Sequence, residues 1–399
     1  CYITTRCVLG NAIPPQGVAK PRSLRLARLV ADMCNGITQQ TPGLMRVLLI
    51  TNDYPPRPGG IQQYLAGLVD AIDGQVRVLA PRHRDGGEEV IRDRRRFMWP
   101  TRRVRRWIES NIAEFMPDVI LFGAPHPLAH LGPRLRRDTG VPYAVVCHGA
   151  EITIPAAFPV TRQLIRYPLT RADVLFAVSE FTRRKVERLT KRSVEVIGAG
   201  VAAAFAPAEA PPSPPVIVGC VSRFVPRKGQ ARVLEACAEL RAEGLDVQAL
   251  LVGKGRDERR LRSLADRLGV PTRFEVGVVF SELPVLYRQM HVFAMPCRSR
   301  WFGLEPEGFG VVFLEAAASG LPVVAGGSGG APETVVPGTT GFVVDRFDAL
   351  VEALRRLVVD SDLRQSMGAA GADRAASRYS WPTVAERFTA GFGGAVGNG

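Results

Sequence analysis

Short apolar runs alternate with amphipathic stretches from about residue 45 to the C-terminus. The runs are rich in Val, Leu and Ile, and the stretch at 61–72 has apolar side chains at the i, i+3, i+4 spacing of a helix. Strand, glycine loop and helix in repeated order are typical of a parallel sheet covered by helices. In the first half we predict buried strands at 47–51, 76–80, 118–122, 143–147 and 173–179.

The same alternation continues after a proline-rich stretch, which is typical of an extended linker. We predict strands here at 216–221, 247–252, 274–276, 291–296 and 321–325. A chain of 399 residues also exceeds the length at which one core usually divides. The sequence therefore predicts an α/β fold in which two doubly wound, Rossmann-like domains face each other across a cleft.

Residues 1–44 lack this periodicity and contain several prolines. We interpret them as a disordered or non-native extension ahead of Met45; the alternative is a targeting peptide, although no clear cleavage pattern is present. The predicted parts are the extension at 1–44, an N-terminal Rossmann-like domain at 45–206, a linker at 207–215, a C-terminal Rossmann-like domain at 216–378 and a helix at 379–399 that packs back across both domains.

The composition narrows the possible partners. A formal net charge of +14 predicts an acidic partner, such as nucleic acid, an anionic membrane or a phosphorylated substrate. The seven cysteines are scattered, without a CxxC pair or a Cys/His cluster, so we expect neither a metal site nor a disulfide framework. No apolar run approaches the ~20 residues of a membrane-spanning helix.

Arginines and aromatic residues are interleaved at 92–108. Exposed Trp and Met beside Arg are typical of a segment that lies on an anionic membrane, and on the premise that these side chains are exposed we prefer this interpretation. The alternative is a solvated basic helix, which Pro100 would interrupt. The residues expected at the membrane or acceptor are Arg94, Arg95, Trp99, Arg102, Arg103 and Trp107.

Candidate ligand-binding residues follow the predicted strands, at the carboxyl edge where doubly wound sheets bind ligands. His148 follows the strand at 143–147, and Arg223 and Lys228 follow the strand at 216–221. A forked guanidinium and a compact ammonium suit a diphosphate, although a structural His and two solvated cations remain the alternatives. Glycines that would let the backbone approach a ligand are Gly59, Gly60, Gly253 and Gly255.

The stretch from Glu307 to Glu315 places two carboxylates eight residues apart across a glycine pair. If a helix begins after Gly310, Glu307 lies at its N-terminus and Glu315 about two turns further along, near the same face. A helix N-terminus suits a phosphate, and carboxylates accept hydrogen bonds from the hydroxyls beside it. The alternative is a capped helix with two surface glutamates.

Together these residues suit a nucleotide diphosphate that carries a hydroxyl-rich group. No Walker sequence occurs, and the first half lacks a Gly-x-Gly-x-x-Gly fingerprint after its opening strand, which argues against a dinucleotide dehydrogenase. No Asp-x-Asp pair stands out as a metal–diphosphate site. We therefore expect no cofactor, with Arg223 and Lys228 neutralising the leaving diphosphate in place of a metal.

Several motifs carry a resemblance to a known family: the loop at 52–61, His148-Gly-Ala-Glu151, the segment at 222–229, Met295-Pro-Cys-Arg298, the stretch at 307–315 and Gly329-Gly-Ala-Pro-Glu333. From Met45 onwards the chain resembles the retaining glycosyltransferases of GT-B architecture. It is most similar to the bacterial phosphatidylinositol mannoside mannosyltransferases that use GDP-mannose.

The resemblance implies a role for each motif residue. Gly60 would lie near the diphosphate and the reacting sugar, and His148 would hydrogen-bond the transferred sugar. Glu307 would hold the sugar hydroxyls and Glu315 those of the ribose. Backbone N–H groups would come from Gly308, Phe309 and Gly310. Retention would follow a front-face route, in which the leaving phosphate oxygen takes the proton of the acceptor hydroxyl.

The resemblance implies transfer of mannose from GDP-mannose to an inositol phospholipid or related glycolipid, on the cytoplasmic face of the cell membrane and without nucleic acid. The sequence departs from the family at Ala150, where many members have His, and in the bulky segment at 298–306. The alternatives are another nucleotide-sugar with a soluble acceptor, a nucleotide-sugar 2-epimerase, and a basic RNA- or membrane-binding protein without transferase activity.

Overall fold

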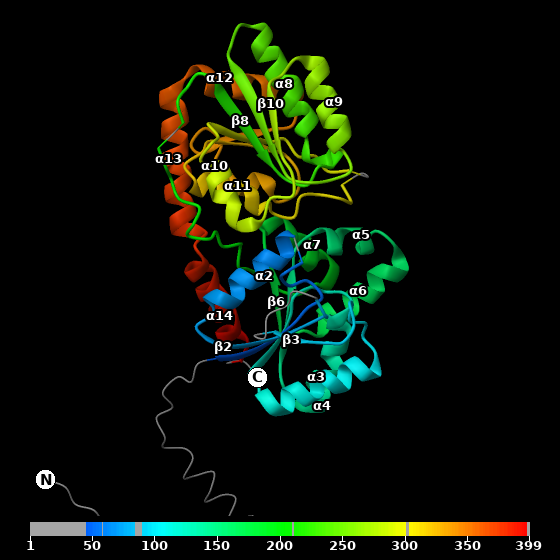
Figure 1. Ribbon diagram of the computed structural model, residues 1–399. Helices are drawn as coiled ribbons and strands as arrows, with labels where there is room; N and C mark the ends of the chain where they lie inside the picture. Colours follow the sequence, from blue (N-terminus) through cyan, green and yellow to red (C-terminus); the bar gives the residue numbers. More distant parts are fainter. Residues whose placement is uncertain (1–44, 58, 84–89, 210, 301–302, 397–399) are drawn as a thin grey trace, which may run out of the picture. The chain divides into compact units, whose positions relative to one another are not determined.

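The computed structural model describes residues 45–57, 59–83, 90–209, 211–300 and 303–396 of the chain, the side chains of 393–396 excepted. The predicted extension at 1–44 lies outside these residues, as do Trp301 and Phe302 in the bulky segment. The described residues form two parallel sheets, each with helices on both of its faces (Figure 1).

The N-terminal sheet has seven strands in the order β3-β2-β1-β4-β5-β6-β7, all paired in parallel. Strands β4, β5 and β6 are buried along their whole length because helices cover both faces of the sheet, and for this reason they are continuous apolar runs in the sequence. The strands are β1 (Met45–Ile50), β2 (Gly74–Ala80), β3 (Val90–Arg92), β4 (Val119–Phe122), β5 (Tyr143–Cys147), β6 (Val174–Ala177) and β7 (Glu195–Val196).

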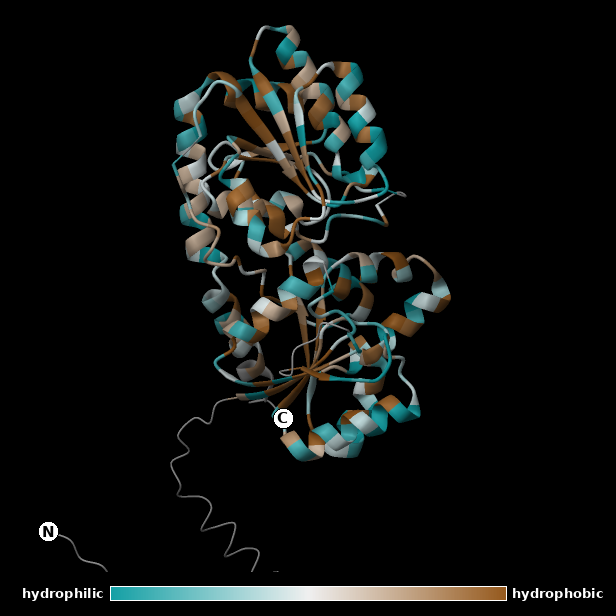
Figure 2. Cartoon of the chain, in the orientation of Figure 1, coloured by the Kyte–Doolittle hydropathy of each residue, from teal (hydrophilic) through white to brown (hydrophobic). Residues whose placement is uncertain are grey.

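The C-terminal sheet has six parallel strands in the order β10-β9-β8-β11-β12-β13. Figure 2 shows the strands of both sheets mainly in the brown of apolar residues, while the helices also carry hydrophilic side chains. The strands are β8 (Val216–Val221), β9 (Val247–Val252), β10 (Thr272–Glu275), β11 (Val292–Met295), β12 (Val323–Gly326) and β13 (Gly341–Val344).

The helices alternate with the strands, as the sequence predicts. Those that follow the N-terminal strands are α2 (Gly60–Ala71), α3 (Arg102–Phe115), the 3₁₀ turn η2 (Leu128–Leu131), α4 (Gly132–Thr139), α5 (Ala150–Ala156), α6 (Pro159–Arg171) and α7 (Glu180–Thr190). Those of the second half are η3 (Pro226–Lys228), α8 (Gln230–Ala242), α9 (Glu258–Leu268), η4 (Phe280–Glu282), α10 (Leu283–Tyr287), α11 (Val311–Ala318), η5 (Ala331–Thr334), α12 (Phe347–Val359), α13 (Ser361–Arg378) and α14 (Trp381–Val396).

The strand order reverses once in each sheet, between β1 and β4 and between β8 and β11. At such a switch point the loops at the carboxyl ends diverge and leave a crevice where ligands bind. The loops after β1, β5, β8 and β11 hold most of the candidate residues. The topology therefore places the predicted motifs at the edge of each sheet where a ligand is expected.

All the predicted strands are present; β5, β8 and β9 have the predicted bounds, and the ends of the others are shifted by at most two residues. Strands β3, β7 and β13 are additional: they were not predicted, and each lies at the edge of a sheet. Ser179 caps α7 by accepting a hydrogen bond from the backbone N–H of Thr182 (3.1 Å). The short edge strands were missed because a strand of two to four residues leaves little pattern in the sequence.

The last helix, α14, packs against α2 and β6 of the N-terminal half. Phe388 and Phe392 lie with their ring centroids 5.0 Å and 5.3 Å from that of Phe176. The same core cluster contains Phe309 and Leu314, from the start of α11. The C-terminal end of the chain therefore contributes to the core beneath the N-terminal sheet.

The basic segment at 92–108 is not one surface element, and the premise that its Trp and Met are exposed holds for Trp99 but is wrong for Met98 and Trp107. Met98 is fully buried: its backbone donates to Asn52 Oδ1 (2.8 Å) and accepts from Asn52 Nδ2 (3.0 Å). Trp107 is half-buried against the N-terminal core. Arg105 pairs with Glu109 (2.7 Å) and Asp138 (3.2 Å), so its charge is used within the protein.

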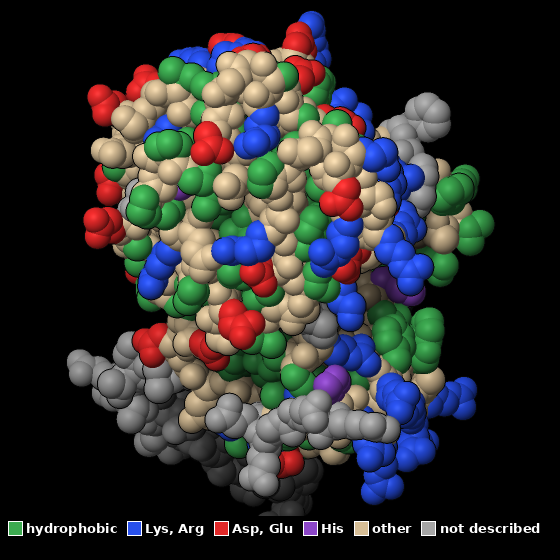
Figure 3. Space-filling view, turned by 45° about the horizontal axis from the view of Figure 1, so that its top comes forward, with side chains coloured by type: hydrophobic (Ala, Val, Ile, Leu, Met, Phe, Trp, Pro, Cys, Tyr) green, Lys and Arg blue, Asp and Glu red, His purple; other side chains and the backbone are tan. Residues whose placement is uncertain are grey.

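A smaller basic and aromatic surface remains. Trp99 is 56% exposed and Phe97 38% exposed, with ring centroids 5.0 Å apart, and Arg94, Arg102 and Arg103 are exposed nearby in the chain. Arg95 is half-buried, 3.9 Å from Asp93. On the face drawn in Figure 3, Lys and Arg side chains gather mainly at the right. Across the described residues, no helix is both long and apolar enough to cross a bilayer.

Candidate active site

A buried cluster of one carboxylate and two cations lies at the carboxyl edge of the C-terminal sheet. Glu307 Oε2 accepts a hydrogen bond from Lys228 Nζ (2.7 Å) and another from Arg227 Nη1 (2.7 Å). Glu307 is 9% exposed and Lys228 8%. The 3₁₀ turn η3 after β8 aims both cations at the carboxylate. Sequence reasoning named Glu307 and Lys228 but missed Arg227.

The cluster keeps Glu307 ionised. Burial alone would raise its pKa, but the charges of Lys228 and Arg227 outweigh burial and hold the pKa of Glu307 below its ordinary value. Among the described residues no hydrogen bond reaches its other carboxylate oxygen, Oε1. One oxygen therefore anchors the cations, and the second can accept a hydrogen bond from a ligand.

Arg223 lies in the same loop as Lys228 but points elsewhere. Its side chain is exposed, and among the described residues it takes part in no ion pair. Its backbone oxygen accepts a hydrogen bond from Gln230 Nε2 (2.9 Å), which fixes the turn after β8. An exposed guanidinium on an ordered turn can bind an anion at this edge of the sheet without first breaking an internal ion pair.

Glu315 is buried, which contradicts the alternative of a surface glutamate. It is 5% exposed, and its Oε2 accepts a hydrogen bond from the hydroxyl of Tyr287 (2.9 Å). Burial raises the pKa of Glu315 to about 7, although the Tyr287 hydrogen bond acts in the opposite direction. Burial therefore makes Glu315 hold its proton to a higher pH than an exposed glutamate does.

The glycine loop ahead of α11 is shaped by close contacts within the protein. Gly310 has φ +88°, in the left-handed region, and is the N-cap of the helix. Phe309 is 6% exposed and packs near Tyr379, with ring centroids 5.9 Å apart, so its side chain belongs to the core and only its backbone can meet a ligand. A Cβ on Gly308 would lie 2.2 Å from the backbone oxygen of His148.

That close approach joins the two motif loops. Gly308 O also accepts a hydrogen bond from Ser179 Oγ (2.9 Å), and Thr153 Oγ1 donates to Leu304 O (2.7 Å). The carboxylate of Glu333 accepts hydrogen bonds from the backbone N–H groups of Glu180 (2.8 Å) and Phe181, at the first turn of α7. Sequence reasoning quoted the Glu333 motif but gave it no role.

His148 is held in one orientation at the end of β5. Its Nε2 lies 2.8 Å from Gly123 O, a contact that requires the proton on Nε2, so in the neutral ring Nδ1 is the acceptor. Its ring meets the Tyr64 ring edge-on, with centroids 5.2 Å apart. The carboxylate of Glu151 accepts hydrogen bonds from the backbone N–H groups of His148 and Gly149 (2.9 Å), so the Glu151 side chain fixes the His-Gly-Ala-Glu turn.

The remaining predicted glycines divide into two kinds. A Cβ on Gly253 would lie 2.0 Å from Ser222 O and one on Gly255 would lie 2.2 Å from Phe224 O, so both allow neighbouring loops to pack. Gly60, the first residue of α2, has open space where a Cβ would be, and a Cβ on Gly59 would meet the side chain of Gln62. Of these four glycines, only Gly60 therefore has open space at its Cβ position.

Acidic side chains do not gather into a metal site. Among the described residues, no group of three or more His, Cys, Asp and Glu side chains could hold an ion. Asp53 accepts a hydrogen bond from Gln62 Nε2 (2.8 Å), and its pKa is raised by burial although the charge of His148 opposes the shift. The cations of the cluster are the groups available to neutralise a diphosphate.

Comparison with known proteins identifies the fold and the family of the chain. The model of the family "Glycosyl transferases group 1" matches residues 203–374, and that of "Glycosyltransferase Family 4" matches residues 58–205. HepE of Anabaena, solved with UDP and glucose, superposes with a TM-score of 0.71 at 19% identity over 88% of this chain and 100% of that one. Sucrose-phosphate synthase of Thermosynechococcus elongatus gives 0.74 at 20% identity over 89% and 100%. Both likenesses concern the fold.

Sequence relatives are more specific. The GDP-mannose-dependent alpha-(1-6)-phosphatidylinositol monomannoside mannosyltransferase of Mycobacterium tuberculosis is 37% identical over 376 aligned residues, which cover 86% of this chain and 97% of that protein. The enzyme of the same name from Mycolicibacterium smegmatis is 38% identical over 372 residues with the same coverage. The chain therefore belongs to the GT-B glycosyltransferases of group 1 and, within them, to the family of the phosphatidylinositol mannoside mannosyltransferases.

Proposed function

We propose that this glycosyltransferase moves mannose from GDP-mannose to an inositol phospholipid or a related glycolipid, with retention of the anomeric configuration. The observation that carries the proposal is the buried Glu307 cluster, whose loop meets the His148 loop at Gly308. The named substrates of the relatives supply the identity of donor and acceptor.

The C-terminal half supplies the donor-binding groups in this proposal. Arg223 and Lys228 bind the diphosphate, and the backbone N–H groups at the start of α11 add to its positive field. Glu307 Oε1 accepts a hydrogen bond from a sugar hydroxyl while Oε2 stays on the cations. Glu315 exchanges its bond with Tyr287 for the ribose hydroxyls.

The transfer step then runs on one face of the sugar. The bond from C1 to the phosphate oxygen breaks, and the departing GDP keeps the electron pair. The acceptor oxygen forms the new bond to C1, and its proton passes to the phosphate oxygen that has just left. Lys228 and Arg223 stabilise the charge of the departing diphosphate, while His148 Nδ1 accepts a hydrogen bond from the sugar.

The N-terminal half holds the acceptor at the membrane in this proposal. Trp99 and Phe97 are the exposed aromatic side chains of the basic surface, and Arg94, Arg102 and Arg103 are its exposed cations. Aromatic rings at the interface and arginines at the lipid phosphates favour an anionic membrane. We propose that the enzyme acts there as a peripheral protein on the cytoplasmic face.

The experiment is a donor and acceptor panel with the purified protein. GDP-mannose, GDP-glucose, UDP-glucose and UDP-N-acetylglucosamine are each offered with phosphatidylinositol, its monomannoside, or no lipid. Product lipids are identified by mass spectrometry, and released nucleotide is measured. We expect mannosylated lipid and stoichiometric GDP only when GDP-mannose and an inositol lipid are both present.

Other results would identify other functions. Epimerised sugar or released nucleotide without any lipid would indicate a nucleotide-sugar 2-epimerase. Transfer from a UDP-sugar to a soluble acceptor would show that both the proposed donor and the proposed acceptor are wrong. Absence of transfer with every donor, combined with vesicle or RNA binding that survives Glu307→Ala, would favour a binding protein.

A further inference from the structure

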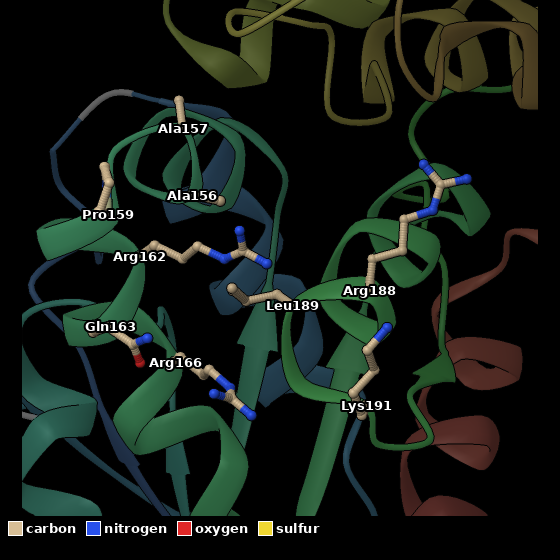
Figure 4. A pocket seen from close by; sticks show the side chains of 9 residues that line it. All are labelled: Ala156, Ala157, Pro159, Arg162, Gln163, Arg166, Arg188, Leu189 and Lys191. Carbon is tan, nitrogen blue, oxygen red and sulfur yellow. The ribbon is translucent and has the colours of Figure 1, made fainter.

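A cavity of about 490 Å³ lies between α6 and α7, apart from the Glu307 and His148 motifs. In Figure 4, Arg162 and Arg166 of α6 reach toward α7, while Lys191, at the end of α7, extends alongside that helix and not toward the two arginines. Arg188 extends away from the centre of the cavity. The side chains that line it belong to Ala156, Ala157, Pro159, Arg162, Gln163, Arg166, Arg188, Leu189 and Lys191.

The charge of this cavity is uncompensated. Its lining contains three arginines and one lysine but no carboxylate, and among the described residues none of these four cations takes part in an ion pair. The neighbouring Arg183 on α7 behaves differently, because it pairs with Glu180 and with Glu187 (2.8 Å). Four cations around one cavity repel each other unless an anion enters, so the cavity favours a phosphate-bearing group.

The start of α6 also carries an exposed apolar face, here called the apolar rim of α6, which lies on another side of the helix from the cavity-lining Arg162 and Arg166. Phe158 is 58% exposed and Val160 74% exposed, and these two residues flank Pro159 of the lining. Leu164 (53% exposed) lies four residues after Val160, and Tyr167 (45% exposed) lies three residues after Leu164, so these three side chains share one face of α6. The Tyr167 ring is partly covered by the Arg171 guanidinium, 4.4 Å from its centroid, so Phe158, Val160 and Leu164 form the open part of this face. Exposed apolar side chains beside cations are typical of a surface that enters a membrane.

We propose that the cavity between α6 and α7 binds the anionic headgroup of a membrane phospholipid, while the apolar rim of α6 enters the lipid. This proposal rests on the proposed function, because it gives the transferase a second membrane contact besides Trp99. A soluble phosphorylated ligand would use the cations but would leave Phe158 and Val160 in water. Helix α5 also begins directly after His148-Gly149, so the segment leading to the rim starts at the proposed reaction site.

The test is sedimentation of the full chain with vesicles of 30% phosphatidylinositol in phosphatidylcholine. Arg162→Gln/Arg166→Gln should weaken binding about 30-fold, roughly fivefold for each arginine. Val160→Ser/Leu164→Ser should also weaken binding, and the remaining binding should be more sensitive to salt because it depends only on charge. The matched control is Arg259→Gln/Arg267→Gln, which removes two exposed cations of α9 and should bind as the wild type does.

Thermal unfolding and GDP-mannose titration of each variant confirm that the fold and the donor site are intact. The proposal is overturned if both α6 variants sediment like the wild type, or if the α9 control loses as much binding as the α6 arginine variant. The proposal is also overturned if the α6 variants lose as much binding to vesicles of pure phosphatidylcholine as to vesicles that contain phosphatidylinositol, since no anionic headgroup would then be involved. Mannosyl transfer to detergent-solubilised lipid is measured in parallel. If that transfer is absent from the wild type while the vesicle results hold, the proposed function fails and this inference stands.

Discussion

Replacement of Lys228 by alanine tests the role of the Glu307 cluster in donor binding. The ammonium lies 2.7 Å from Glu307 Oε2 and is 8% exposed, so water screens it little. In the proposed complex it also donates to the diphosphate, and a hydrogen bond to a charged group contributes about 1.5–3 kcal/mol. We therefore expect the dissociation constant of GDP-mannose to rise about 10- to 160-fold in Lys228→Ala, measured by isothermal titration.

The variant should still fold, because Arg227 remains 2.7 Å from Glu307 and keeps the buried carboxylate paired. With one cation fewer to offset burial, the pKa of Glu307 should rise relative to the wild type. Arg259→Ala, which removes an exposed cation of α9, is the control and should bind GDP-mannose normally. Unchanged donor affinity in Lys228→Ala, with the control also unchanged, would refute the role of this cluster.

Three further outcomes are expected. Burial raises the pKa of Glu315 from its ordinary value to about 7, so the folded state holds this proton more tightly than the unfolded state and loses stability as the pH rises from ~4.5 through 7. The unfolding free energy of Glu315→Gln should therefore exceed that of the wild type by more at pH 8 than at pH 5, with a difference of no more than ~3 kcal/mol. Urea titrations that give the same excess at both pH values would contradict this assignment. His148→Ala should lower kcat for mannosyl transfer while the calorimetric affinity for GDP stays the same, since in the proposed complex His148 contacts the sugar and not the nucleotide. Weakened GDP binding would argue against that position. Gly308→Ala places a Cβ 2.2 Å from His148 O and should lower both the melting temperature and the rate of transfer. The Cβ of Gly60→Ala meets open space, so this variant should lower the rate of transfer alone if the donor occupies that space. Full activity of Gly60→Ala would show that the donor does not lie there.

Most of the fold could be predicted from the sequence because the central strands are buried on both faces. Such strands appear as continuous apolar runs with glycines at their ends, and β5, β8 and β9 have the predicted bounds. The same pattern located His148 and Lys228, since residues that follow buried parallel strands lie at one edge of the sheet. Edge strands such as β7, with the sequence Glu195-Val196, have no such run.

The errors have a different physical cause, because they depend on contacts distant in the sequence. Arg223 and Arg227 look alike in a basic loop, and only the 3₁₀ turn decides that Arg227 points to Glu307 while Arg223 stays exposed. Met98 is buried because Asn52, which precedes it by 46 residues, binds its backbone. Local pattern alone cannot show such pairings.

The central claim of the proposal is that Glu307 binds the sugar while Lys228, beside it, and Arg223 bind the diphosphate. The most direct test is calorimetric titration of wild type and Glu307→Gln with GDP-mannose and, separately, with GDP. Because Gln removes the negative charge that Lys228 and Arg227 neutralise, the variant should bind GDP at least as tightly as the wild type does. It should lose the additional affinity that the mannosyl group provides. Equal losses for GDP-mannose and GDP, or no change for either ligand, would contradict the account.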